Sequence, residues 1–124
     1  MAKATILVAE DDPVLRNLYE KKFVIEGYTV LTAQDGEDAV KMLQDGTQKI
    51  DLLLLDINMP KKDGFQVLQE FPKGKRTFPV IMLTNFDQGE FKLKAFELGA
   101  EDYFVKKDMT MRTLVEMVRR LLKL

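Results

Sequence analysis

Acids, a hydroxyl and an amine stand at the ends of four apolar runs in this sequence. In chain order, residues 6–9 precede Glu10, Asp11 and Asp12; residues 52–55 precede Asp56; residues 80–83 precede Thr84; and residues 103–105 precede Lys106. If these runs are strands of one parallel sheet, their carboxyl ends meet at the edge where α/β folds place ligand sites. The pattern therefore predicts a shallow cup that suits a divalent cation and a phosphoryl group.

The acidic run after the first strand contains one structural residue and two candidate ligands. Asp12 directly precedes Pro13, and this pair is typical of a helix N-cap followed by the first helical position. Glu10 and Asp11 would repel each other, and Asp56, unless a cation lies between them. Mg²⁺ binds through one or two carboxylates and water. Solvated turn acids are the alternative interpretation.

Asp56 is the candidate nucleophile. A carboxylate at a rigid strand end beside a metal can attack phosphorus without a general base, because it is already ionised. The chain has no histidine, which fits this route and disfavours most hydrolases. Lys106 would pair with Asp56 and then with a phosphoryl oxygen, and Thr84 would donate to that oxygen. A surface lysine and an ordinary β-branched strand residue are the alternatives.

Composition places the chain among ordinary globular proteins. Its 124 residues suffice for one domain, which we expect to span residues 1–124, and they include no cysteine. A net charge of −1 argues against direct binding of nucleic acid. The apolar runs are too short to insert into a membrane, so we expect a soluble, cytoplasmic protein.

Strand-like and helix-like segments alternate five times along the sequence. We expect strands at residues 5–9, 28–33, 52–56, 80–84 and 102–105, and helices at residues 13–26, 36–44, 64–71, 88–98 and 110–122. Unbroken apolar strands joined by helices predict a parallel sheet covered on both faces. Right-handed crossovers then give an α/β fold with a doubly wound five-stranded parallel sheet.

Two further structural expectations concern single segments. In the first helix, the buried residues should be Leu15, Leu18, Tyr19 and Phe23. The basic stretch at residues 73–76 lies in a connector rich in helix breakers, and we expect it to be a solvated loop.

The chain resembles the receiver domains of bacterial two-component response regulators along nearly its whole length. The resemblance lies in residues 6–13, 54–60, 63–64, 79–84 and 98–106, which include Glu10-Asp11-Asp12-Pro13, Asp56-Ile57-Asn58-Met59-Pro60 and Asp102-Tyr103-Phe104-Val105-Lys106. It implies a flavodoxin-like (βα)5 fold with strand order 2-1-3-4-5. It also implies phosphorylation of Asp56 by a phosphohistidine on a sensor histidine kinase or histidine phosphotransfer protein.

The resemblance assigns roles to the other residues of the cup. Glu10, Asp11 and Asp56, with the backbone carbonyl of Asn58, would hold Mg²⁺. Lys106 would sense the phosphate, and Thr84 and Tyr103 would form a coupled switch pair. Phosphate would draw the Thr84 hydroxyl inward, Tyr103 would move to a buried position, and the face formed by the fourth helix, fifth strand and fifth helix would repack. An amphipathic edge aromatic without a switching role is the alternative for Tyr103.

Three residues depart from the family pattern or modify it. Lys107 replaces the usual proline after Lys106, and because a non-proline cis bond costs about 3–4 kcal/mol, we expect a trans peptide there. Asn85 follows Thr84 where a small residue is usual, and its amide would crowd the phosphoryl group or donate to it. We expect Phe86 to screen the acyl phosphate from water and slow its hydrolysis; a half-exposed loop aromatic is the alternative.

The sequence therefore favours a signalling switch that catalyses only its own phosphoryl transfer and slow dephosphorylation. It would act as a monomer or a phosphorylation-dependent dimer and pass its state to a downstream protein. A phosphatase with an aspartyl intermediate would need an acid at Asn58, and a flavin carrier would need a phosphate-binding loop in place of residues 10–12. The remaining alternative is a pseudo-receiver that binds partners without phosphorylation.

Overall fold

The computed structural model describes residues 2–85 and 89–124. Within these residues the strands are β1 (Thr5–Ala9), β2 (Thr29–Ala33), β3 (Leu52–Asp56), β4 (Val80–Thr84) and β5 (Asp102–Val105). The helices are α1 (Pro13–Ile25), α2 (Gly36–Gln44), α3 (Gly64–Glu70), α4 (Gly89–Glu97) and α5 (Met111–Leu122), with one short 3₁₀ turn at Lys73–Lys75. The expected alternation of strands and helices is confirmed.

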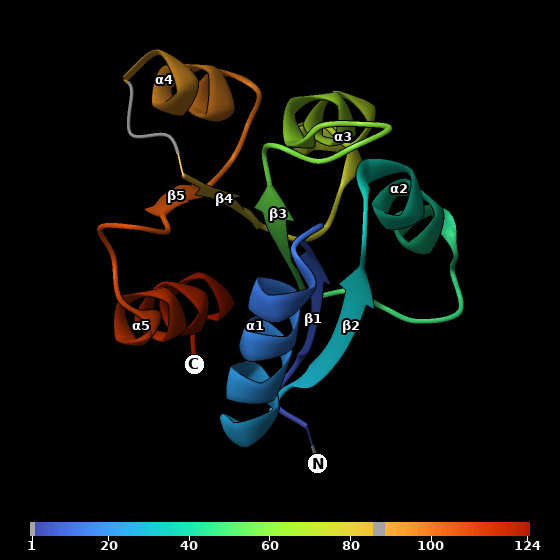
Figure 1. The fold of residues 1–124 in the computed structure, drawn as a ribbon. Helices are drawn as coiled ribbons and strands as arrows, with labels where there is room; N and C mark the ends of the chain where they lie inside the picture. Colours follow the sequence, from blue (N-terminus) through green and yellow to red (C-terminus); the bar gives the residue numbers. More distant parts are fainter. Residues whose placement is uncertain (1, 86–88) are drawn as a thin grey trace.

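All strands of the sheet are parallel, in the order β2-β1-β3-β4-β5. Figure 1 shows α1 and α5 on one face of this sheet and α2, α3 and α4 on the other. Because helices cover both faces of the sheet, the side chains of its strands alternate between two apolar layers. One layer packs against α2, α3 and α4, and the other against α1 and α5. The fold is the predicted doubly wound α/β fold, with the strand order that the family resemblance implies.

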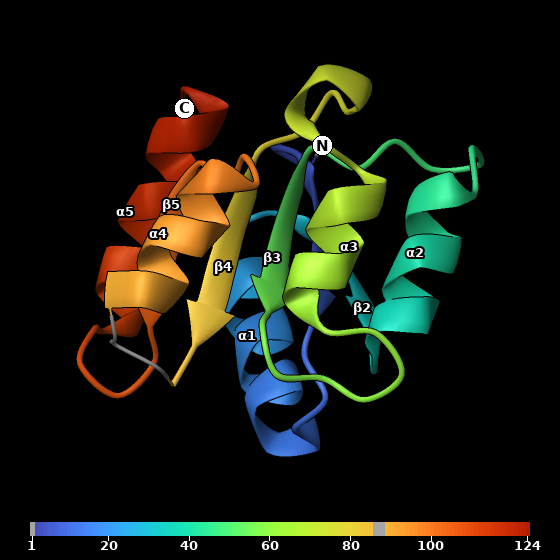
Figure 2. The same cartoon turned by 90° about the horizontal axis from the view of Figure 1, so that it is seen from above.

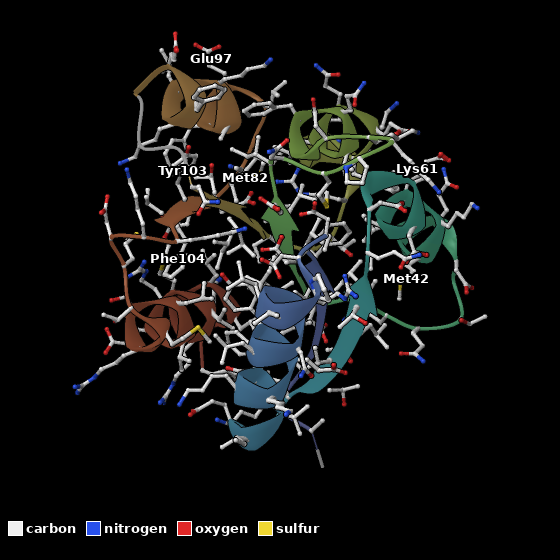
Figure 3. The ribbon with its side chains drawn as sticks, viewed as in Figure 1. Met42, Lys61, Met82, Glu97, Tyr103 and Phe104 are labelled. Atoms are coloured by element: carbon white, nitrogen blue, oxygen red, sulfur yellow. The ribbon has the colours of Figure 1, made fainter. Side chains whose placement is uncertain are left out.

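Two residues on β5 illustrate this alternation. Tyr103 points to the α4 side of the sheet, and Phe104 points to the α5 side (Figure 3). Both are buried. The same view places Met82, the β4 partner of Tyr103, on the α4 side. Tyr103 therefore packs in the layer that contacts α4, and Phe104 packs in the layer that contacts α5.

Helix α1 differs from the sequence prediction in one respect. Tyr19 and Phe23 are buried as expected, and Leu15 is half-buried, but Leu18 is 49% exposed. Val14 and Ile25 are also exposed, so apolar side chains occur on both sides of this helix. Its core-facing side is centred on Tyr19 and Phe23, which turns Leu18 away from the sheet.

The prediction of a solvated loop at residues 73–76 is wrong for Arg76. Its side chain is only 1% exposed, and its guanidinium pairs with Glu101 at 2.8 Å. It also donates to the carbonyl oxygens of Phe71, Phe78 and Gly99 at 2.6–2.9 Å. Arg76 thus ties the α3–β4 connection to the α4–β5 turn, at the edge of the sheet opposite the candidate site.

The loop after β3 is held in place by two glycines. A Cβ on Gly64 would lie 2.5 Å from the carbonyl oxygen of Asp56, and a Cβ on Gly36 would lie 1.9 Å from that of Lys62. Only glycine permits this close approach of α3 and α2 to the loop. Asp63 then caps α3 through a reciprocal capping box with Gln66. The backbone that follows Asp56 is therefore fixed from two sides.

Candidate functional site

The strand register brings the predicted site residues to one edge of the sheet. Ala9 pairs with Leu55, so the next residues of these strands, Glu10 and Asp56, stand side by side. On the other side of β3, Thr84 pairs with Val105, so Lys106 leaves the sheet beside Thr84. The backbone N–H of Lys106 donates to the carbonyl of Thr84 at 2.7 Å. Figure 2 shows β3 and β4 pointing toward this same edge.

Lys106 is the cation of a nearly solvent-free cluster. Its ammonium donates to Oε1 of Glu10 and lies 3.4 Å from Oδ1 of Asp56. Its side chain is 8% exposed, Glu10 is fully buried, and Asp56 is 4% exposed. Charges this far from water need partners, and one lysine here serves two carboxylates. The cluster therefore carries an excess of acid.

The pKa values of the two buried carboxylates are shifted in opposite directions. Burial, followed by the hydrogen bond and the charge of Glu10, raises the pKa of Asp56 to about 8. Burial alone would also raise the pKa of Glu10, but hydrogen bonds with the Asp56 and Lys106 side chains outweigh it and lower this pKa. Without a metal ion, the pair of carboxylates therefore holds one proton, on Asp56, near neutral pH.

The donor set fits Mg²⁺. Glu10, Asp11 and Asp56 each offer a carboxylate oxygen, and these atoms lie within 4.8 Å of one another. Glu10 and Asp56 are buried, whereas Asp11 is exposed and faces the solvent side. Hard oxygen ligands that leave room for water are the ligands that Mg²⁺ prefers. The excess acid around Lys106 is the charge that a divalent cation would offset.

These residues line an open cavity of about 240 Å³. Its walls are formed by Glu10, Asp11, Asp12, Leu15, Asp56, Asn58, Asn85 and Lys106. A water molecule occupies about 30 Å³ in the liquid, so the cavity can admit a small hydrated ion together with a tetrahedral oxyanion. The predicted cup is thus present, and it is polar.

Asp12 has the structural role predicted for it. Its Oδ1 accepts from the backbone N–H of Val14 at 2.9 Å and of Leu15 at 3.4 Å, and Pro13 occupies the first position of α1. Its own N–H donates to Oε2 of Glu10 at 3.4 Å. The cap thereby links the start of α1 to the buried acid.

Asn58 and Asn85 lie around the rim of the cavity. The backbone N–H of Asn58 donates to Oδ1 of Asp56 at 3.4 Å, which orients the carboxylate. Asn85 is exposed and lines the cavity, so its amide is within the site rather than beside it. Phe86, which we expect to screen the acyl phosphate, lies outside the described residues.

The switch pair and the loop after β5 are also located. Thr84 is 1% exposed at the end of β4, and Tyr103 is buried in the layer beneath α4. The burial of Tyr103 does not distinguish a switch residue from an amphipathic edge aromatic, and the switching role stays a prediction. The Lys106–Lys107 peptide is trans, as expected without proline. A turn follows, in which Asp108 and Met109 donate to the carbonyl of Val105.

Two residues of the site were not predicted from the sequence. Leu15 forms an apolar part of the cavity wall, and Arg16 reaches back to the turn that carries Glu10 and Asp11. Nη1 of Arg16 donates to the carbonyl oxygen of Glu10 at 2.9 Å and to that of Asp11 at 3.4 Å. The position of Leu15, two residues after Pro13, could have indicated that it lies near the site. No sequence signal could have identified Arg16, because its partners are backbone carbonyls.

Comparison with known proteins agrees with this geometry. The family model of the response regulator receiver domain matches residues 6–119. The transcriptional regulatory protein CpxR of Klebsiella pneumoniae is 42% identical over 118 residues, which cover 95% of this chain and 49% of that protein. The alkaline phosphatase synthesis transcriptional regulatory protein PhoP of Bacillus subtilis is 41% identical over 82% of this chain and 41% of its own length. The chain thus spans half or less of the length of these curated relatives.

Solved structures show the same fold. The receiver domain of the Francisella response regulator 1452 superposes with a TM-score of 0.89 at 30% identity, and the match covers 98% of both chains. The Thermotoga maritima response regulator TrrA, solved in complex with Mg²⁺ and beryllium fluoride, gives a TM-score of 0.81 at 34% identity over 95% of this chain and 98% of its own. The chain belongs to the response regulator receiver domains, the phosphorylation-controlled modules of two-component signalling.

Proposed function

We propose that this chain is a single receiver domain that accepts a phosphoryl group on Asp56. The observation that carries this proposal is the buried cluster of Asp56, Glu10 and Lys106 at the open end of the sheet. A carboxylate oriented by the Asn58 N–H and flanked by one ammonium is a suitable acceptor. The donor would be a phosphohistidine on a sensor histidine kinase or a histidine phosphotransfer protein.

The acidic residues support Mg²⁺ as the cofactor. Glu10, Asp11 and Asp56 would hold the ion, together with the backbone carbonyl of Asn58. When bound, Mg²⁺ would neutralise charge on the phosphoryl oxygens and the attacking carboxylate. The match to the Thermotoga protein, whose structure contains Mg²⁺ and beryllium fluoride, supports the same assignment.

A bound divalent cation would favour the ionised form of Asp56, so the chemical step would need no general base. An ionised oxygen of Asp56 would attack the phosphorus, the phosphorus–nitrogen bond of the donor would break, and the electron pair would leave with the imidazole nitrogen. The Lys106 ammonium would turn from carboxylate to phosphoryl oxygen, and the Thr84 hydroxyl would donate to another oxygen. Asn85 and Phe86 would modulate the later attack of water on the acyl phosphate.

Signal output would follow from the position of Thr84 and Tyr103. Both are buried, on adjacent strands, and Tyr103 packs in the layer that α4 covers. A hydrogen bond from Thr84 to the phosphoryl group would hold Tyr103 in its buried position and stabilise one arrangement of α4, β5 and α5. That face would then bind a downstream protein or a second receiver domain, so the domain would be a monomer or a phosphorylation-dependent dimer.

The domain would be a switch rather than an enzyme for other substrates, limited to its own phosphoryl transfer and slow autodephosphorylation. A cytoplasmic location fits a histidine kinase partner. Among the described residues, no helix has the length and apolarity required to cross a bilayer.

The curated relatives are transcriptional regulators. We infer that any contact with DNA belongs to another domain, since this chain carries a net charge of −1.

Intact mass measured after incubation with acetyl phosphate tests the proposal. With Mg²⁺, we expect a gain of one phosphoryl group; with EDTA in place of Mg²⁺, or with Asp56→Asn, we expect none. A folded protein that gains no phosphoryl group from acetyl phosphate or from phosphohistidine donors would favour the pseudo-receiver alternative. A gain that persists in Asp56→Asn would place the acceptor elsewhere.

A further inference from the structure

Arg16 occupies an unusual place in the turn that carries the acidic residues. It lies in the opening turn of α1, and its half-buried side chain folds back against the chain direction of the helix. A single nitrogen, Nη1, contacts the carbonyl oxygens of two consecutive residues, Glu10 at 2.9 Å and Asp11 at 3.4 Å. Both of these residues contribute carboxylates to the candidate metal site.

The carbonyl groups of Glu10 and Asp11 lie between the hydrogen bonds of the sheet and those of helix α1. The paired residues of β1 end at Ala9, and the N–H of Glu10 makes a further bond to the carbonyl of Ala33. The first helical bond of α1 runs from the N–H of Arg16 to the carbonyl of Asp12. Within residues 2–85 and 89–124, no backbone N–H donates to the carbonyl of Glu10 or of Asp11. Backbone carbonyls at such positions need another partner. The Arg16 side chain is that partner, so it fixes the peptide planes of the two residues.

Charge adds a second reason for an arginine at this position. Three successive acids, Glu10, Asp11 and Asp12, repel one another in the metal-free protein. Arg16 keeps its positive charge at every relevant pH, and it contacts the backbone of the turn rather than its carboxylates. It can therefore offset the repulsion without occupying the oxygens that a cation would need.

We propose that Arg16 is a positioning residue that sets the Mg²⁺ affinity of the receiver site by holding the β1–α1 turn in its ligand-presenting conformation. This inference rests on the proposed function. Mg²⁺ tolerates little distortion of its ligand geometry, so a turn that relaxes in the absence of Arg16 binds the ion more weakly. Residues that orient metal ligands commonly change metal affinity by about 10- to 100-fold when they are replaced.

The test compares Mg²⁺ binding to three folded variants by isothermal titration calorimetry. Arg16→Met keeps the apolar stem and removes both hydrogen bonds, and we expect about tenfold weaker binding. Arg16→Lys retains a charge and donors, and we expect an intermediate loss of about threefold. Arg112→Met is the control: Arg112 is 90% exposed on α5, and its removal changes the net charge equally. Screening should keep its effect within about twofold.

A second readout separates positioning from chemistry. In Arg16→Met, the Mg²⁺ concentration that gives half-maximal phosphorylation by acetyl phosphate should rise about tenfold, while the rate at saturating Mg²⁺ stays within about twofold of wild type. In the metal-free protein, the amides of residues 10–12 should exchange faster with solvent in this variant than in wild type. A purely structural role would lower the melting temperature and leave the Mg²⁺ concentration for half-maximal phosphorylation unchanged.

The possible failures are distinguishable. If wild type binds Mg²⁺ and Arg16→Met binds it within twofold of wild type, this inference is wrong and the proposed function stands. The same conclusion holds if Arg112→Met weakens binding as much as Arg16→Met does. If wild type itself binds no Mg²⁺, the proposed function fails and this inference fails with it. Should Arg16→Met not fold, Arg16→Lys alone decides, and an affinity equal to that of wild type overturns the inference.

Discussion

The ammonium of Lys106 lies 3.4 Å from Oδ1 of Asp56, and both side chains are almost completely shielded from water. The two residues come from the ends of different strands, with β4 between them in the sheet. Lys106 also pairs with Glu10, so one cation holds two buried carboxylates together. The ammonium of Lys106 offsets the repulsion between the Glu10 and Asp56 carboxylates in the metal-free, unphosphorylated protein.

Replacing Lys106 should therefore destabilise the metal-free protein. Lys106→Met leaves Glu10 and Asp56 facing each other without a cation, and we expect a loss of about 3 kcal/mol in the free energy of unfolding at pH 8. Urea unfolding in EDTA measures this loss. Lys107→Met, which removes an exposed charge one residue away, should cost less than about 1 kcal/mol. Equal losses in the two variants would show that the pairing of Lys106 with the buried carboxylates does not contribute to the free energy of unfolding.

The raised pKa of Asp56 predicts an unusual pH dependence. In the folded protein this pKa is about 8, against an ordinary value of 3.8, so between these values the folded state holds a proton that the unfolded state has released. Stability of the metal-free protein should then fall as pH rises from 5 to 8, by at most about 1.4 kcal/mol per pH unit. The lowered pKa of Glu10 adds stability that is lost only below this window.

Urea unfolding in EDTA at several pH values between 5 and 8 checks this slope. The chain has no histidine, the side chain that ordinarily titrates in this range. Asp56→Asn should abolish the slope, because the amide neither binds nor releases a proton. A wild-type stability that rises with pH across the window would contradict the raised pKa.

The role of Thr84 can be separated from that of the acceptor. Thr84→Val removes the hydroxyl but keeps the branched shape, so acetyl phosphate should still phosphorylate the protein. The amide chemical shifts of α4, β5 and α5 should then change much less on phosphorylation than they do in wild type. Thr84→Ser, which retains the hydroxyl, should respond like wild type. A full response in Thr84→Val would remove Thr84 from the switch.

Arg76 offers a contrast, since it should matter for stability alone. Arg76→Met removes the main partner of the half-buried Glu101 carboxylate and the donor to three backbone carbonyls, and we expect a loss of about 3 kcal/mol in the free energy of unfolding. Mg²⁺ affinity of the folded variant should be unchanged, because Arg76 lies at the opposite edge of the sheet. Lys75→Met, at an exposed position, serves as the control. A changed Mg²⁺ affinity would indicate coupling between the two edges.

The sequence predicted the sheet well because its strands are short, apolar and sharply bounded. β1, β3, β4 and β5 have the expected bounds, and their chemically active ends meet as expected. The prediction was wrong about Leu18, because α1 carries apolar residues on both sides and periodicity could not identify the side that faces the sheet. It was also wrong about Arg76, whose partner Glu101 is remote in sequence.

Arg16 shows a different limit of sequence reasoning. Its partners are backbone carbonyls, and these acceptors are the same whatever residues carry them. The carboxylates and the lysine of the site could be recognised because their side-chain chemistry is specific. The contacts that position them depend on the folded shape of the turn between β1 and α1, which side-chain chemistry does not specify.

Locating the phosphoryl group is the measurement that tests the central claim most directly. After phosphorylation with acetyl phosphate and Mg²⁺, borohydride reduction converts an aspartyl phosphate into homoserine, and peptide mass spectrometry identifies the residue that carries it. We predict homoserine at position 56 and none in a sample treated with EDTA instead of Mg²⁺. Homoserine at Asp11 or at another acid, with Asp56 intact, would contradict the account.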